Sequence, residues 1–284
     1  MTRVVYVNGE FIPEAEAKIS IFDRGFLFAD GVYEVTAIIN GKLIGWHGHI
    51  SRLNRSLNEI NMPMPESEAK ILELHRSIVE LNNLSQGIVY MQVSRGSTDR
   101  DFNIVDGLRP SLVMFTQELN LLDPKRLDRS LRVMTVNDIR WGKNHIKTIQ
   151  LLASSLIKTE AIKKGYDDAL LIKDGYVTEG TSSNAFIIDC NKSIITRNLG
   201  CEILSGITRS DLLSTIKKVG LKVEERPFSI DEAKGAREAF ITSASNFVVS
   251  IGEIDDTSIG SGSIGQITKM LQDEYITQMV KASI

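Results

Sequence analysis

The chain has 284 residues, of which 42% are hydrophobic and 24% charged, and its net charge is −3 at pH 7. This length and composition are typical of a globular protein with one large or two medium domains. The slight acidity and the 6% of aromatic residues argue against a basic, stacking surface for nucleic acid. The N-terminus lacks the apolar core of a signal peptide, and no apolar run approaches the roughly 20 residues of a membrane helix. Because the chain has only two cysteines, we expect a reducing, cytoplasmic location.

Short runs rich in β-branched residues flank several turn-forming dipeptides and predict antiparallel strand pairs. Asn-Gly and Asp-Gly are typical of tight hairpins, because both central positions of such turns favour positive φ. The fourth dipeptide, Asn-Lys, separates two apolar runs and predicts another strand pair. The turns are centred on Asn8-Gly9, Asn40-Gly41, Asp174-Gly175 and Asn191-Lys192.

Helical periodicity appears between these hairpins. Residues 49–62 and 67–84 each carry apolar side chains at spacings of three and four, which predicts two amphipathic helices. Hairpins mixed with helices indicate an α+β protein rather than a doubly wound parallel sheet. The polar stretch Gln117–Ser130 contains a turn at Asp123-Pro124. We therefore expect an N-terminal domain over residues 1–118, a linker over 119–130 and a C-terminal domain over 131–284.

One lysine of the second half stands just before an apolar stripe. A strand is predicted over residues 130–141, and a helix is then predicted to begin near Thr148 and to end near Gly165. Lys147 would lie at the N-terminus of that helix, where the dipole disfavours a cation and a lowered pKa would make the amine nucleophilic. From these residues alone, a solvated surface lysine remains the alternative. The stripe consists of Ile149, Leu152, Ala153, Leu156 and Ile157.

Three further segments carry polar groups that suit a charged ligand but are unspecific when taken alone. Glu179 lies in "YVTEGTSSNAF" and could face a cationic ring, although a solvated acid in a polar loop is the ordinary interpretation. Gly206-Ile207-Thr208 precedes a clear helix and would offer free N–H groups to a phosphate. The segment "AFITSASNFV" also ends a strand in small hydroxyl residues.

Other motifs are interpreted as structural. The sequence "GSGSIG" at Gly260–Gly265 matches the dinucleotide pattern, but it lacks a preceding strand and a following acid, so we expect a turn before the last helix. His47 and His49 have no third metal ligand at a matching spacing. Cys190 and Cys201 lack a C-x-x-C spacing and are expected to be packing residues.

Taken together and in order, eight motifs resemble those of the fold-type-IV pyridoxal-phosphate enzymes, and the similarity covers nearly the whole chain. The sequence is most similar to bacterial D-amino acid aminotransferases, whose second strand also reads Asp-Gly-Val-Tyr-Glu. The resemblance implies an α+β fold with a smaller N-terminal α/β domain and a larger C-terminal domain with a β-barrel-like core. It also implies a homodimer with its site at the subunit interface. The motifs are "DRGFLFADGVYE", "HISRL", "VSRGSTDR", "DIRW", "IKT", "TEGTSSNAF", "GITR" and "FITSAS".

The resemblance also implies pyridoxal 5'-phosphate as the cofactor and assigns residues to it. Lys147 matches the lysine that forms a Schiff base with the cofactor and moves the substrate proton. Glu179 matches the acid that contacts the pyridine nitrogen, and Arg52 matches a phosphate-binding arginine. Five more residues match the phosphate seat or the apolar contact with the ring: Leu204, Ile207, Thr208, Ser243 and Ala244.

For the substrates, a D-amino acid and a 2-oxo acid such as 2-oxoglutarate or pyruvate, the resemblance implies three residues. Tyr33 matches an active-site tyrosine, and Arg100 matches an arginine that the neighbouring subunit supplies to the substrate carboxylate. Phe102 stands where the aminotransferases carry histidine, and Ala37 stands where a basic residue is often found. These two differences predict a less polar substrate pocket. It keeps (R)-selective amine transamination open, beside branched-chain aminotransferase and aminodeoxychorismate lyase activity on the same fold.

Overall fold

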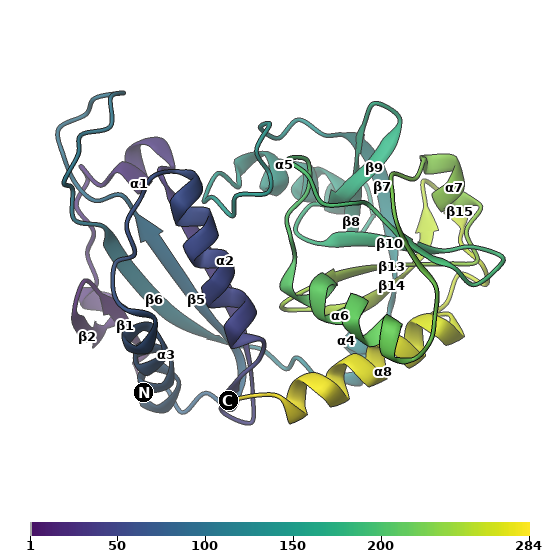
Figure 1. Ribbon diagram of the computed structural model, residues 1–284, viewed down its shortest axis with the longest axis horizontal. Helices are drawn as coiled ribbons and strands as arrows, with labels where there is room; N and C mark the ends of the chain where they lie inside the picture. Colours follow the sequence, from purple (N-terminus) through teal and green to yellow (C-terminus); the bar gives the residue numbers. More distant parts are fainter. Residues whose placement is uncertain (1) are drawn as a thin grey trace. The chain divides into compact units, whose positions relative to one another are not determined.

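The computed structural model describes residues 2–284, which form two compact units. Unit 1 runs to Leu121 and also includes Ile146–Gln150 and Ala282–Ile284. Unit 2 consists of Leu122–His145 and Leu151–Lys281. Two short segments from the second half of the sequence are therefore built into unit 1 (Figure 1).

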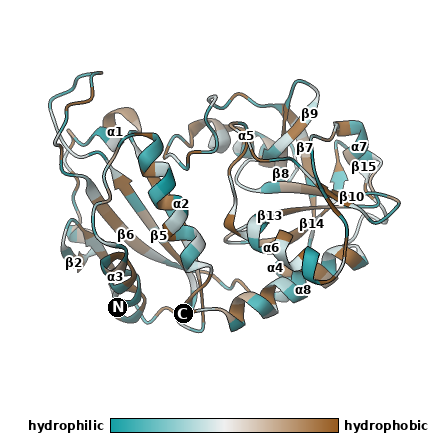
Figure 2. Cartoon of the chain, viewed as in Figure 1, coloured by the Kyte–Doolittle hydropathy of each residue, from teal (hydrophilic) through white to brown (hydrophobic). Residues whose placement is uncertain are grey.

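Unit 1 is built on a six-stranded antiparallel sheet with the order β2-β1-β6-β5-β3-β4. The central strands alternate buried and partly buried positions, and Figure 2 shows hydrophobic residues along β5 and β6. Helix α2 packs against β3, and α3 packs against β1 and β6. The elements are β1 (Val4–Val7), β2 (Glu10–Pro13), the 3-10 turn η1 (Glu14–Glu16), α1 (Arg24–Phe28), β3 (Gly31–Ile39), β4 (Lys42–Leu43), α2 (Trp46–Glu59), α3 (Glu68–Leu81), β5 (Gln86–Ser94) and β6 (Ser111–Glu118).

Both helices predicted in the first half are confirmed, and their apolar stripes form the core of unit 1. In α2 the stripe buries Ile50, Leu53 and Leu57. Helix α3 begins after Ser67, whose hydroxyl accepts a hydrogen bond from Lys70 N and so satisfies one of the free amides of the first turn. The helix positions follow from the periodicity and the cap together.

Unit 2 is built on a nine-stranded mixed sheet with the order β12-β11-β10-β13-β14-β7-β8-β9, to which β15 adds beside β14. Strand β9 also lies against β10, so the sheet curls back toward its own middle. The α+β fold with a curled sheet that the resemblance implies is thereby confirmed. The strands are β7 (Ser130–Asn137), β8 (Asp168–Lys173), β9 (Tyr176–Gly180), β10 (Asn184–Ile188), β11 (Ile194–Thr196), β12 (Val223–Glu225), β13 (Glu238–Ser243), β14 (Phe247–Ile254) and β15 (Thr257–Ser258).

The helices of unit 2 cover this sheet. Helix α5 packs against β7 and β8 through Ile157 and Ala161, and α8 packs against β13 and β14. The glycine-rich segment Gly260–Gly265 forms the turn before α8, as predicted. No helix within residues 2–284 combines the length and the apolarity that crossing a membrane requires. The helices are α4 (Pro124–Leu127), α5 (Leu152–Lys163), α6 (Ile207–Lys218), α7 (Ile230–Lys234) and α8 (Gln266–Lys281).

The four predicted turns join antiparallel strands in both units. Asn and Asp at the first turn position have positive φ, which these short polar side chains tolerate. The turns at Asn8, Asn40 and Asp174 lead from β1 to β2, from β3 to β4 and from β8 to β9. In the turn between β10 and β11 the residue with positive φ is Lys192.

The predicted helix start at Thr148 is wrong. Helix α5 begins at Leu152, with Leu151 as its N-cap. Residues 146–150 form no helix; Thr148 makes an isolated antiparallel bridge with Val32 of β3, and Tyr33 N donates to Lys147 O at 3.0 Å. Lys147 therefore does not lie at a helix N-terminus.

The apolar stripe after Lys147 is divided between two structures, and this explains the wrong prediction. Ile149 N donates to Gly31 O at 3.1 Å, so Ile149 belongs to the segment Ile146–Gln150 of unit 1. In α5, Leu152 and Leu156 are exposed, whereas Ile157 is buried. Pairing with β3 overrides the helical periodicity at the start of the stripe.

Candidate active site

Lys147 is held by the backbone of unit 1, and its amine lies over an aromatic ring. Its peptide N donates to the Ser56 hydroxyl at 3.3 Å, and its carbonyl accepts from Tyr33 N. The Nζ atom lies 4.0 Å from the centroid of the Tyr33 ring, within cation–π distance. Within residues 2–284 the amine has no carboxylate partner. The side chain is therefore fixed in place without a counter-ion.

Tyr33 is the first of three stacked rings that come from neighbouring strands. The rings of Tyr33 and Tyr90 are 5.5 Å apart, and those of Tyr90 and Phe115 are 4.7 Å apart. Tyr90 and Phe115 are directly opposite each other on β5 and β6, which brings aromatic side chains into contact. The Tyr90 hydroxyl donates to Gln92 Oε1 at 2.8 Å, and burial raises the Tyr90 pKa, so this phenol stays neutral.

On the opposite face of β3, a buried carboxylate binds two basic side chains of α2. Successive residues of a strand point to opposite faces, so Glu34 lies on the face away from Tyr33. Arg52 donates from Nε and Nη2 to the two Glu34 oxygens at 2.8 and 2.6 Å, and His49 Nδ1 is 2.7 Å from Oε2. Burial raises the Glu34 pKa, but Arg52 and His49 outweigh it and lower the pKa to about 2. Burial lowers the His49 pKa, and Glu34 opposes that change.

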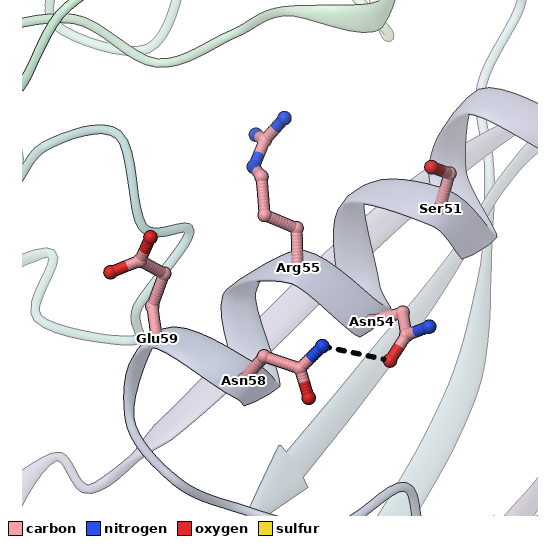
Figure 3. Close-up of a pocket in the computed structure, with 5 residues that line it drawn as sticks. All are labelled: Ser51, Asn54, Arg55, Asn58 and Glu59. Atoms are coloured by element: carbon pink, nitrogen blue, oxygen red, sulfur yellow. Dashed lines mark hydrogen bonds between the residues drawn. The ribbon is translucent and has the colours of Figure 1, made fainter.

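The exposed face of α2 carries a separate hollow of about 520 Å³. Figure 3 shows that its side chains project from successive turns of one helix face, and Asn58 Nδ2 donates to Asn54 Oδ1 at 3.4 Å. The hollow contains no lysine, cysteine or histidine, and we assign it no catalytic role. It is lined by Ser51, Asn54, Arg55, Asn58 and Glu59.

In unit 2, Glu179 ends β9 as a buried carboxylate with three hydrogen-bond donors. Arg140 Nη1 donates to Oε1 at 2.5 Å, and Oε2 accepts from Asn184 Nδ2 at 2.9 Å and from Leu204 N at 3.1 Å. Burial raises the Glu179 pKa, and the Arg140 charge opposes the rise. A carboxylate offers about four acceptor positions, so Glu179 can accept one further hydrogen bond.

Arg140 is itself oriented by Asp138, two residues earlier in the "DIRW" motif. Its Nε and Nη2 donate to Asp138 Oδ1 and Oδ2 at 2.9 and 2.7 Å, and Thr178 also donates to Oδ2 at 3.0 Å. Sequence reasoning did not assign Asp138, Arg140 or Asn184 to the site. The i, i+2 spacing of an acid and an arginine at the end of a predicted strand was the available signal.

The start of α6 lies beside the Glu179 network. Gly206 is the N-cap and no side chain caps the helix, so the first-turn amides of Ile207 and Thr208 have no acceptor within the helix. A Cβ at Gly206 would overlap Asn184 Oδ1. Asn184 Nδ2 also donates to Leu204 O at 2.9 Å. One amide side chain thus connects the buried carboxylate with the helix N-terminus.

Other predicted residues of unit 2 adjoin this network. The Thr208 hydroxyl is buried and hydrogen-bonded to Tyr275, so the amides rather than this hydroxyl are presented at the helix start. Ser243 and Ala244 follow at the end of β13, where Thr242 pairs with Asn184 of β10. Ser243 Oγ accepts from Asn246 N at 3.2 Å and shapes the turn there.

Arg100 and Phe102 lie in the exposed loop between β5 and β6 of unit 1. Ala37 is buried within β3, and its carbonyl accepts from Ile44 N. The structure therefore groups Tyr33, Arg52 and Lys147 around β3 and α2. The loop between β5 and β6, which contains Arg100, belongs to the same unit. Unit 2 holds the other predicted residues, namely Glu179, Leu204, Ile207, Thr208, Ser243 and Ala244.

Two other expectations concern residues outside these groups. Within residues 2–284, no cluster of His, Cys, Asp or Glu has the composition of a metal site. Cys190 and Cys201 are both free and exposed, so their prediction as packing residues is wrong. Cys190 lies just after β10 and Cys201 lies in the loop before α6, and neither position faces a core.

Replacing Arg140 with methionine tests the electrostatics of unit 2. Two buried carboxylates then lose their cation, and we expect the free energy of unfolding near neutral pH to fall by roughly 3–5 kcal/mol. Burial raises the Glu179 pKa without the opposing Arg140 charge in this variant, so the loss becomes smaller as the pH falls and the carboxylate takes up a proton. Denaturant unfolding at neutral and mildly acidic pH measures both effects.

The exposed Arg237, which has no side-chain partner among the described residues, supplies the matched control variant, Arg237→Met. Adding Glu179→Gln to Arg140→Met removes one unpaired charge and should restore part of the lost stability. An equal loss of unfolding free energy in Arg140→Met and Arg237→Met contradicts this role of Arg140. A loss in Arg140→Met that does not change with pH also contradicts it.

Known proteins resemble the chain in sequence and in fold. Residues 31–254 match the amino-transferase class IV family. The chain is 37% identical to the D-alanine aminotransferase of Bacillus licheniformis over 268 residues, 94% of each chain. It is 34% identical to the D-alanine aminotransferase of Staphylococcus aureus (strain N315), over 95% of this chain and 96% of the other.

Solved structures share the fold at lower sequence identity. The branched-chain amino acid aminotransferase of Escherichia coli superposes with a TM-score of 0.90 at 20% identity, covering 98% of this chain and 95% of the other. The branched-chain aminotransferase of Thermoproteus uzoniensis, solved with norvaline, has a TM-score of 0.88 at 24% identity, covering 99% and 96%. A third branched-chain enzyme, solved with pyridoxamine 5'-phosphate, has a TM-score of 0.90 at 23% identity, covering 99% and 95%. The family match and the relatives above 30% identity together establish that the chain belongs to the class IV aminotransferases.

Proposed function

We propose that the protein is a pyridoxal-phosphate-dependent D-amino acid aminotransferase. It transfers the amino group of a D-amino acid, of the D-alanine or D-glutamate type, to a 2-oxo acid such as 2-oxoglutarate or pyruvate. Family membership and the relatives named D-alanine aminotransferase support this reaction. The single observation that carries it is the Lys147 amine, which lies against the Tyr33 ring without a carboxylate partner among residues 2–284.

The donor and acceptor groups of the chain fit pyridoxal 5'-phosphate. The Lys147 amine would hold the aldehyde of the cofactor covalently. The remaining acceptor position of Glu179 suits the N–H of a protonated pyridine ring, and Leu204 provides an apolar contact beside it. For the phosphate we assign the amides at the start of α6, with Arg52, Ser243 and Ala244 as further contacts.

The proposed mechanism gives different roles to Lys147 and Glu179. When bound, the cofactor ring accepts the electron pair that the substrate Cα releases. The Lys147 amine would serve as the general base that takes up the substrate Cα proton and holds it during the transfer. Glu179 keeps the ring nitrogen protonated, because its charge favours the cationic ring. Tyr33 limits the directions in which the Lys147 side chain can point.

The substrate preference rests on the loop of unit 1. We assign Arg100 to the substrate carboxylate and Tyr33 and Phe102 to the walls of the substrate site. Phe102 adds an apolar surface to this loop, so an amine without a carboxylate, such as (R)-1-phenylethylamine, is a second candidate donor beside the carboxylate-bearing substrates assigned to Arg100. The branched-chain enzymes share the fold at 20–24% identity, which carries no argument about substrate.

We also propose a cytoplasmic homodimer in which each chain supplies Arg100 to the site of its partner. The two free cysteines are consistent with a reducing compartment. Several large apolar side chains around the Arg100 loop and α1 are exposed, and a patch of this kind is typical of a protein interface. They are Ile21, Phe22, Phe26, Phe102, Ile104 and Val105.

Replacing Lys147 with alanine tests the covalent role of the amine. Borohydride should fix the cofactor to a peptide containing Lys147 in the wild type and to no lysine in Lys147→Ala. Turnover of D-alanine should fall at least about a hundred-fold, because the general base is lost. Lys143→Ala, at an exposed lysine four positions earlier, is the control and should behave as the wild type. Undiminished turnover by Lys147→Ala in the absence of added amine contradicts the mechanism.

A substrate panel tests the donor class. We expect D-alanine with 2-oxoglutarate to yield pyruvate, while L-leucine gives no change in the absorbance of the cofactor. The absorbance after single additions of D-alanine, D-glutamate, L-leucine and (R)-1-phenylethylamine measures the half-reactions. Turnover of L-leucine alone would establish a branched-chain enzyme. Pyruvate formation from aminodeoxychorismate without an amino acceptor would establish a lyase.

Mixed dimers test the contribution of Arg100 to the partner's site. Arg100→Ala and Lys147→Ala chains, carrying different tags and produced together, should form dimers in which one site has both residues intact. We expect activity above the mean of the two separate variants, and sedimentation should give the mass of two 31.6-kDa chains. A monomer, or mixed dimers without recovered activity, rejects the shared site.

A further inference from the structure

The Arg100 guanidinium lies against two aromatic rings of its own unit. Its central carbon is 5.5 Å from the centroid of the Phe28 ring and 5.4 Å from that of Phe102. The two rings are themselves 5.5 Å apart in an edge-to-face arrangement. Both contacts are within cation–π distance. The side chain is thus held by the faces of two rings, one from α1 and one from its own loop.

Arg100 has no hydrogen bond and no ion pair with any residue between 2 and 284. A guanidinium carries five N–H donors in its plane, and aromatic faces do not use these donors. The edge of the group therefore remains able to bind an oxyanion. A planar carboxylate matches this edge with two parallel hydrogen bonds.

A second arginine holds the loop itself. Buried Arg24 donates from Nη1 to Asp101 O at 2.7 Å and to Asn103 O at 3.4 Å, which fixes the backbone on both sides of Phe102. Its Nε donates to Asp30 Oδ2 at 2.8 Å, and its central carbon lies 4.6 Å from the Phe28 centroid.

The two arginines around Phe28 therefore differ in charge balance. Arg24 and Arg95 share the carboxylate of Asp30, whereas Arg100 has no carboxylate partner among the described residues. Arg100 is therefore the arginine of this cluster whose N–H donors remain available to a carboxylate.

We propose that Phe28 and Phe102 form an aromatic clamp that orients Arg100, the residue to which the proposed function assigns the substrate carboxylate. Phe102 is then a positioning residue, which orients the guanidinium through its ring face in place of a hydrogen bond. The identity of the ligand, a 2-oxo or amino acid, rests on the proposed function. The clamp itself rests on the contacts within unit 1.

Calorimetric binding of pyruvate to the holoenzyme in its pyridoxal form tests the clamp without turnover. Phe102→Leu keeps an apolar side chain but removes the ring, and an exposed cation–π contact of this kind corresponds to roughly a two- to five-fold weaker binding. Phe102→Trp keeps a ring over the guanidinium and should weaken the binding less than Phe102→Leu does. Arg100→Ala should lose the binding. Since Phe102 is 78% exposed, neither Phe102 variant is expected to unfold.

Phe11→Leu is the control, because the Phe11 ring is 36% exposed on β2 and contacts Tyr6 instead of Arg100. In D-alanine turnover, Phe102→Leu should raise KM by the factor by which it weakens pyruvate binding, and it should leave kcat unchanged. A general destabilisation of the protein does not raise KM alone in this way. Wild-type affinity in Phe102→Leu, equal weakening in Phe102→Trp, or no pyruvate binding to the wild type overturns the clamp.

The two proposals fail in different ways. If pyruvate binding depends on Arg100 and Phe102 but no amino group is transferred, the clamp stands and the proposed function falls. If D-alanine is turned over while neither substitution changes pyruvate affinity, the proposed function stands and the clamp falls.

Discussion

Each unit is organised around a carboxylate that is removed from water and paired with an arginine. Glu34 binds the fork of Arg52 in unit 1, and Glu179 binds Arg140 in unit 2. An unpaired buried charge is strongly unfavourable, so the geometry of each pair is a condition for folding as well as for chemistry. The arginines and acids are consequently fixed in position before any ligand arrives. This preorganisation is what an electrostatic site requires, since no reorientation then opposes binding.

The secondary structure extends these two pairs into larger assemblies. In unit 1, α2 carries Arg52 and, one turn later, Ser56, which accepts the peptide hydrogen of Lys147. The strand alternation of β3 then places Glu34 under α2 and Tyr33 on the opposite face. In unit 2, Asn184 extends from Glu179 to the start of α6. A substitution at either carboxylate would therefore disturb the whole assembly, and a buried pair contributes more to orientation than to net stability.

Local signals predicted much of the fold from the sequence. The hairpin at Asp174-Gly175 and the helices α2 and α3 follow from turn chemistry and periodicity, which depend on neighbouring residues. The helix expected at Thr148 does not form, because residues 146–150 pair with β3, far away in the sequence. A periodic apolar pattern does not reveal that its first residues belong to a different unit.

The difference between local sequence signals and contacts across the fold also applies to the candidate site. Lys147 and Glu179 were identified because they stand in motifs that resemble a family, not because their surroundings could be derived. Arg140 and Asn184 were missed, because an arginine or an asparagine near a strand end is usually a surface residue. Their importance comes from contacts with Glu179 that only the folded unit creates. Exposure of Cys190 and Cys201 was likewise a property of the fold and not of their residue type.

The ring beneath the Lys147 amine positions this side chain without a carboxylate partner among residues 2–284. A carboxylate at the same distance would stabilise the ammonium form, and an ammonium is neither a nucleophile nor a base. The face of Tyr33 gives a weaker attraction that still restricts the side chain. The stack through Tyr90 to Phe115 then fixes that face across three strands. Arg100 is held in the same way by Phe28 and Phe102, so both groups that must exchange partners during the proposed reaction are positioned by rings rather than by opposite charges.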